Sequence, residues 1–182
     1  MTNGNQNLQP ATDSPRIYVA CLASYNSGVL HGAWIAASQD PDDIHADIKT
    51  MLAQSREPIA EEWAIHDFEG FHGLRLAEYE SIEKVSDIAN VIAEHGQLGA
   101  ELISHCDSPD AAREALDDNY QGSFDSPAAW AEQLLEDSGD LAQIPERLRG
   151  YFDFESYARD AELSGDIFVI EVDRQHHVFW SR

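Results

Sequence analysis

Short apolar runs near the start of the chain predict a β-hairpin. Arg16–Ala23 is rich in β-branched and aromatic residues, a composition typical of strands. Ser24–Gly28 then supplies turn residues, and a second apolar run follows at Val29–Ala37. We expect the two runs to pair as antiparallel strands.

A helix and a third strand complete this first pattern. Asp40 and Pro41 provide an N-cap followed by proline at the first helical position. Trp63–Phe68 then returns to a strand pattern. We therefore predict a ββαβ-like N-terminal domain over residues 15–74. The apolar residues at helical spacing in its helix are Ile44, Ile48, Met51 and Leu52.

From Ser81 onward the apolar period becomes that of a helix. Gly96 stands where a helix C-cap belongs, a second helix is expected over 97–105, and a third begins at Ser108–Pro109. These elements predict a small helical middle domain over residues 75–114. The residues expected on the buried face of its first helix are Ile82, Val85, Ile88, Ala89 and Ile92.

The last third of the chain mixes strands and helices. We expect a strand over Asn119–Phe124, a helix that begins at Ser126–Pro127 and ends near Gly139, and a helix over 153–163. A hairpin should close the chain. Its strands are predicted at Asp166–Val172 and His177–Trp180, with the polar turn Asp173–His176 between them.

Together these patterns predict an α+β protein, an elongated chain of three small domains. The third domain, over residues 115–182, combines helices with the antiparallel hairpin. The polar stretch Met1–Pro15 has neither the positive start nor the apolar stretch of a signal peptide, and we interpret residues 1–14 as a disordered leader.

The charge balance is strongly acidic. The chain has 34 Asp and Glu against 11 Lys and Arg, for a net charge of −23, and its only lysines are Lys49 and Lys84. The predicted segments 1–14, 15–74, 75–114 and 115–182 carry −1, −6, −6 and −10, so the acidity belongs to the folded body. Such a surface repels nucleic acid and anionic membranes.

Other features of the composition indicate a cytoplasmic protein. No apolar run approaches the roughly 18 residues of a membrane helix. Cys21 and Cys106 are far apart and lack CxxC spacing, which favours two ordinary thiols in a reducing compartment over a disulfide.

The acidic residues of the middle segment form stripes at helical spacing. One stripe lies opposite Ile82, Ile88 and Ile92, and a second follows on the next acidic helix. Carboxylates recur at positions i and i+4 of these helices, where a pair of opposite charges would stabilise the helix by about 0.2–0.5 kcal/mol. We predict that these stripes bind a protein partner. The candidate carboxylates are Glu80, Glu83, Asp87, Glu94, Asp110, Glu114, Asp117 and Asp118.

The charge is sufficient to imitate duplex DNA, although composition alone does not single out this role. Duplex DNA carries one charge per about 1.7 Å, so 34 carboxylates match the phosphates of about 17 base pairs. Any single stripe is more often an ordinary solvated face. A surface adapted to concentrated salt, or a general acidic protein-binding module unrelated to restriction, has the same composition.

Enzyme hypotheses find less support. His66 and Asp67, with Glu61, Glu62 and Glu69, resemble a metal site, but neighbours on a strand point to opposite faces. A calcium loop from Asp117 lacks its final Glu, because Ala128 stands there. His176 and His177, at the predicted turn, have no HExxH context. We therefore predict no catalytic residue, no metal and no cofactor.

The four tryptophans follow apolar patterns and are expected to pack in the core. They are Trp34, Trp63, Trp130 and Trp180.

Several stretches in the same order resemble the ArdA antirestriction family. Together they cover almost everything after the leader, which makes the resemblance far more specific than any one motif. These stretches are Arg16–Trp34, Glu61–Gly70, Glu78–Ile82, Leu134–Gly139, Pro145, Tyr151–Phe154 and Ala158–Asp166.

The resemblance implies a function and an assembly. ArdA proteins are typically encoded on mobile genetic elements. They have three small domains and form an elongated, curved dimer that resembles bent B-DNA. They inhibit type I restriction-modification enzymes, chiefly through the methyltransferase core. The chain would be a non-enzymatic homodimer that binds neither nucleic acid nor membrane. The family's antirestriction motif, associated with dimer formation, corresponds to Leu134, Leu135, Glu136, Asp137 and Gly139, and Asp137–Ser138 replaces its more usual Glu-Thr.

Overall fold

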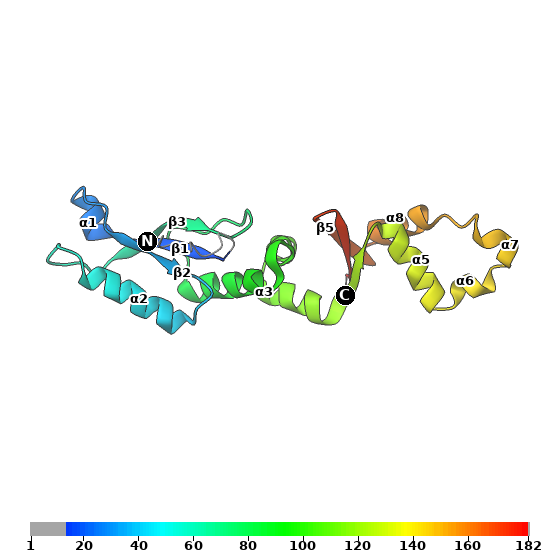
Figure 1. Ribbon diagram of the computed structural model, residues 1–182, viewed down its shortest axis with the longest axis horizontal. Coiled ribbons are helices and arrows are strands. Elements are labelled where there is room, and N and C mark those ends of the chain that lie inside the picture. Colours follow the sequence, from blue (N-terminus) through cyan, green and yellow to red (C-terminus); the bar gives the residue numbers. More distant parts are fainter. Residues whose placement is uncertain (1–13, 182) are drawn as a thin grey trace, which may run out of the picture. The chain divides into compact units, whose positions relative to one another are not determined.

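The computed structural model describes residues 14–181 and divides the chain into two compact units. One unit ends at Ala100 and the other begins at Glu101. Each contains a three-stranded antiparallel sheet with helices, so the α+β class is confirmed (Figure 1). The elongated arrangement and the division into three domains stay predictions. Residues 1–13 of the expected leader lie outside the described residues, whereas Pro15 is buried.

The sheet of the first unit has the order β2-β1-β3. Its strands are β1 (Arg16–Cys21), β2 (Gly32–Ala36) and β3 (Trp63–Glu69), and β1 is antiparallel to both neighbours. The predicted hairpin of β1 and β2 is confirmed, but its connection differs from the expected turn. The strand ends at Cys21, which is the N-cap of a short helix, α1 (Leu22–Asn26). Leu22 and Ala23, which were predicted to belong to the strand, therefore begin this helix.

Helix α2 (Pro41–Ala53) packs against β1 and β2 and confirms the ββαβ order. Asp40 caps its N-terminus by accepting a hydrogen bond from the amide of Asp42. Ile44, Ile48 and Met51 are buried, as their spacing predicts, and Leu52 is half-buried. The three buried residues belong to the core of the unit together with Ile17 and Val19 of β1.

Helix α3 (Ile82–Cys106) contains both of the helices predicted around Gly96. Gly96 has φ 58° and ψ −138°, a non-helical conformation that separates the two helical parts of α3. The first part therefore ends at Gly96, as predicted. The five apolar residues predicted to share a face are buried. The boundary between the two units falls inside α3, after Ala100.

The second unit is built on a sheet of order β4-β6-β5. Its strands are β4 (Tyr120–Phe124), β5 (Ile167–Val172) and β6 (Gln175–Trp180), close to the predicted positions. The loop of the hairpin is shorter than expected, because Gln175 and His176 belong to β6. Asp173 and Arg174 alone make the turn, with φ 51° and 66°, the left-handed backbone that two-residue hairpin loops require.

The predicted helices of the second unit begin where the sequence predicts. Ser108 caps α4 (Pro109–Glu114), Ser126 caps α5 (Pro127–Asp137) and Asp153 caps α8 (Phe154–Ser164). Hydrogen bonds from the backbone and hydroxyl of Ser156 hold the pKa of the Asp153 carboxyl below its usual value. Three short elements escaped prediction: the π-helical turn η1 (Ala115–Asn119), α6 (Asp140–Gln143) and α7 (Glu146–Arg149).

Helices α5 and α8 pack against each other and against the sheet of this unit (Figure 1). Trp130 and Ala131 of α5, Ala158 of α8, and Ile167 and Val178 of the sheet form one buried apolar cluster. The segment from α5 to α8 is therefore held to the sheet mainly by apolar burial.

A second aromatic cluster lies around β6. Phe179 is fully buried and stacks on Phe168, with ring centroids 4.9 Å apart, while Tyr120 packs on it at the same distance. His177 shares a 2.8 Å hydrogen bond between its Nδ1 and the Tyr120 hydroxyl. Burial raises the pKa of Tyr120 and lowers the pKa of His177, so both rings favour their neutral forms.

Candidate partner-binding surface

The acidic side chains of both units point outward. Every Asp and Glu in residues 14–181 is exposed except Glu57 and Glu80, which are half-buried. Residues 1–100 contain 15 acids and five bases, and residues 101–182 contain 19 acids and six bases. Each unit therefore presents a large excess of negative charge to solvent.

The first predicted stripe is present on α3 in a shortened form. Glu83, Asp87 and Glu94 are exposed on the helix, while its apolar face is buried. Glu80 does not belong to this stripe, because it precedes the helix, which begins at Ile82. The hydroxyl of Ser81, just before the helix, accepts a hydrogen bond of 3.3 Å from the amide of Lys84. Glu80 is instead half-buried and its carboxylate lies 3.3 Å from Nζ of Lys84.

The second stripe is divided between two elements. Asp110 and Glu114 lie on α4, whereas Asp117 and Asp118 lie on η1, and all four are exposed. The prediction of a single α-helical stripe through Asp117 is wrong, because the α-helix ends at Glu114 and a π-helical turn begins at Ala115. The change of helix type alters the direction in which the later carboxylates project.

Other helices also carry exposed carboxylates that are not among the predicted contacts. Asp42, Asp43 and Asp47 lie on α2, and Glu155, Asp160 and Glu162 lie on α8. Their position opposite the buried apolar residues of the same helix was the signal that could have found them.

The few cations do little to neutralise this surface. Arg113 lies 3.1 Å from Asp110, and Arg159 lies 3.5 Å from Asp160, both on the surface. Exposed pairs of this kind contribute about 0.2–1 kcal/mol each. Since acids outnumber bases by 23, one-to-one pairing would still leave most carboxylates without a protein cation.

The residues of the rejected enzyme hypotheses do not converge. Within the described part of the chain, His, Cys, Asp and Glu form no group of three that could hold a metal. Asp67 accepts a hydrogen bond from the Phe68 amide, and Asp117 and Asp118 lie in the π-helical turn rather than in a calcium loop. Glu61 and Glu62 precede β3 and Glu69 ends it. His176 and His177 are consecutive residues of β6, not turn residues.

The tryptophans and cysteines follow the predictions with one exception. Trp130 is buried and Trp180 packs against it, whereas Trp63 is half-buried. Trp34 is 39% exposed, because it lies on the outer face of β2 beneath the Arg16 guanidinium. Cys21 and Cys106 are free thiols, as expected.

The candidate dimer segment lies at the end of α5. Leu135 is buried and Leu134 packs against the apolar cluster of its own unit. Glu136 and Asp137 are exposed, and Gly139 has φ 79° at the start of α6. The two leucines of this segment are therefore already engaged within the fold.

In the described residues, every helix is too short or too polar to cross a membrane.

Residues 17–174 match the model of the antirestriction protein (ArdA) family. No curated protein matches the chain. The match covers most of both units, including all of the elements from α1 to β5.

Proposed function

The chain belongs to the ArdA family of antirestriction proteins, non-enzymatic DNA mimics that inhibit type I restriction enzymes, and we propose which of its carboxylates contact the enzyme. The carboxylates of α3, α4 and η1 take the positions of DNA phosphates in the basic groove of the methyltransferase core. The observation that carries this proposal is the outward orientation of the acids in both units.

The mechanism is competitive occlusion. A DNA-binding groove gains affinity from Lys and Arg side chains that contact phosphates and release counterions. Exposed carboxylates at helical spacing offer the same cations an alternative set of anions. Occupation of the groove blocks DNA entry without a catalytic step, and it requires no cofactor. The place of action is the cytoplasm, where restriction enzymes meet incoming DNA.

The contact is distributed over many weak interactions. Glu83, Asp87 and Glu94 on α3, with Asp110, Glu114, Asp117 and Asp118 beyond it, are each exposed and each contribute little alone. Glu80 is a weaker candidate, because its carboxylate is half-buried beside Lys84.

Salt provides the experiment that tests this electrostatic contact. The affinity of the chain for a purified type I methyltransferase should fall at least about tenfold between about 0.05 and 0.2 M salt, because salt screens the charges and competes for the groove. Isothermal titration at several salt concentrations measures the slope, with sucrose as an uncharged control. An affinity independent of salt would indicate apolar docking and would contradict the proposal.

A homodimer would lengthen the acidic surface, and we place its contact at the end of α5 and in the segment that follows. Leu134 and Leu135 are engaged in the fold, so the contact needs other apolar groups. Leu148 is 46% exposed and Tyr151 is 85% exposed, shortly after the 134–139 segment. Exposed apolar side chains of this size are typical of protein interfaces.

Sedimentation velocity tests the dimer. The unaltered chain should sediment as a dimer, and Tyr151→Asp should shift it toward the monomer because a charge would be desolvated in the interface. Leu163→Asp is the matched control, since Leu163 is 80% exposed on α8 outside the proposed contact. A monomeric unaltered chain, or a Tyr151→Asp variant that remains dimeric, would contradict this assignment.

A further inference from the structure

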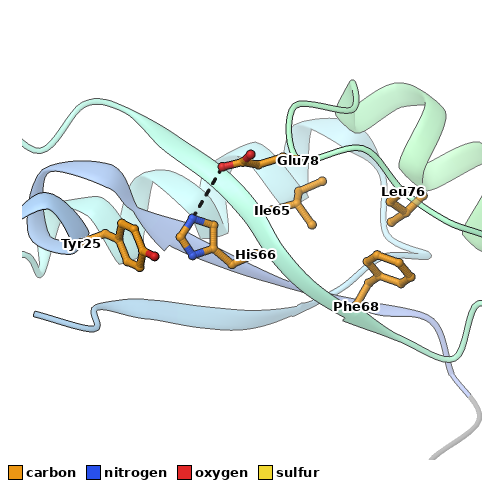
Figure 2. A pocket seen from close by; sticks show the side chains of 6 residues that line it. All are labelled: Tyr25, Ile65, His66, Phe68, Leu76 and Glu78. Carbon is orange, nitrogen blue, oxygen red and sulfur yellow. Dashed lines mark ion pairs between the residues drawn. The ribbon is translucent and has the colours of Figure 1, made fainter. Parts of the chain in front are cut away.

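The first unit contains an open pocket beside β3 that the imitation of phosphates does not use. The pocket has a volume of about 440 Å³. Figure 2 shows the side chains around it. They are Tyr25, Ile65, His66, Phe68, Leu76 and Glu78.

An irregularity in β3 shapes this pocket. Tyr18 of β1 pairs with Asp67 while Val19 pairs with Ile65, so His66 is an additional residue in the strand. Such a bulge interrupts the alternation of side chains. Ile65 and His66, although consecutive, both border the pocket, and Asp67 does not.

The segment after β3 supplies the acidic side of the pocket. The amide of Ile65 donates a hydrogen bond of 2.9 Å to the carbonyl of Glu78, which ties this segment to the strand. The Glu78 carboxylate lies 4.0 Å from Nε2 of His66 and is 55% exposed. On the other side of the His66 ring, Tyr25 packs edge-on with centroids 4.8 Å apart (Figure 2).

We propose that this pocket binds the guanidinium group of an arginine side chain presented by a protein partner. Glu78 accepts hydrogen bonds from the guanidinium, and the Tyr25 and Phe68 rings offer surfaces on which it stacks. Ile65 and Leu76 contact the aliphatic part of the side chain. A lysine fits less well, because its compact, strongly hydrated ammonium neither stacks nor forms a fork with a carboxylate.

The same sheet already binds one guanidinium in this manner. Arg16 lies over the Trp34 ring, 4.8 Å from its centroid, and its Nε donates to the Glu69 carboxylate at 2.8 Å. A carboxylate beside an aromatic ring is thus a combination that this fold uses to hold arginine. Around the pocket the carboxylate is Glu78 and the nearby rings belong to Tyr25, His66 and Phe68.

The partner's identity rests on the proposed function, because an enzyme groove that binds DNA presents arginines. The pocket would add a specific anchor to an otherwise distributed contact. Binding of a free arginine derivative, by contrast, depends only on the pocket itself and is tested separately.

The direct test is an NMR titration of the isotope-labelled full chain with N-acetyl-L-arginine amide, at a slightly alkaline pH where histidines carry little charge. We expect saturable shifts at Ile65, His66 and Glu78, with weaker binding of the lysine amide and none of the uncharged citrulline amide. Glu78→Gln should weaken binding at least about tenfold, as expected for the loss of a charge-assisted pair. Glu61→Gln, which removes the same charge outside the pocket, should change it less than about twofold.

Two results would overturn the proposal: no saturable shift at the pocket residues, or an equal loss of affinity in Glu78→Gln and Glu61→Gln. Tyr25→Leu tests the stacking surface in the same way, with Tyr157→Leu on α8 as its control. Inhibition of the methyltransferase is measured in parallel. If arginine amide fails to bind while inhibition persists, the pocket assignment fails alone; if it binds while the enzyme is unaffected, the proposed function fails alone.

Discussion

Replacing Glu83, Glu94, Glu114, Asp117 and Asp118 together by their amides is expected to weaken inhibition of a type I methyltransferase about 100-fold. Each exposed carboxylate contributes about 0.2–1 kcal/mol, so five contribute about 3 kcal/mol, which corresponds to about two powers of ten in affinity. All five are exposed, so the amides should leave the core unchanged. The measurement is the concentration of protein that halves DNA methylation.

Two controls make this result specific. Each single amide should change inhibition less than about fivefold, which is the upper end for one exposed contact. A variant with the same change in net charge, Glu132, Glu155, Asp160, Glu162 and Glu171 to amides, should retain most of the inhibition. A loss from this control equal to that of the first variant would show that only total charge matters and would contradict the assignment to α3, α4 and η1.

Phe179→Ala is expected to destabilise the second unit by about 4 kcal/mol. Removal of a fully buried Phe side chain costs about 3–5 kcal/mol, since the lost transfer free energy adds to that of the cavity. The ring stacks on Phe168 and contacts Tyr120, so both neighbours lose packing as well. The total stability of a domain is about 5–15 kcal/mol, and this single change removes a large part of it.

Denaturant unfolding followed by tryptophan fluorescence measures the loss, because Trp130 and Trp180 lie in the same unit. Phe179→Leu should lose less than the alanine variant, since more of the cavity stays filled. Leu163→Ala, at an exposed position of α8 outside the proposed dimer contact, should stay within about 0.5 kcal/mol of the unaltered chain. A loss below about 1 kcal/mol for Phe179→Ala would mean that the aromatic cluster around β6 does not hold the unit together.

Local chemistry explains why most elements could be predicted from the sequence. Asp40, Ser108, Ser126 and Asp153 lie at predicted helix starts, and each caps its helix because its side chain accepts a free amide of the first turn. The strands were equally readable, since β-branched and aromatic residues gather in runs bounded by turn residues.

Other features depend on contacts that a linear pattern does not contain. The bulge at His66 arises from the pairing of β3 with β1, and the π-helical turn at Ala115 interrupts a helix whose residues have ordinary propensities. The acidic surface was therefore predictable as a charge excess, whereas the direction of individual carboxylates was not. The pocket at Glu78 was not predictable either, because it joins α1, β3 and a later loop.

Competition with DNA tests the central claim most directly. A purified type I methyltransferase is bound to fluorescently labelled duplex DNA at moderate salt, and the chain is added while anisotropy is followed. We predict displacement of the DNA at nearly stoichiometric protein, with no cleavage or chemical change of either component. Retention of the DNA by the enzyme at a large excess of folded protein would contradict the decoy mechanism.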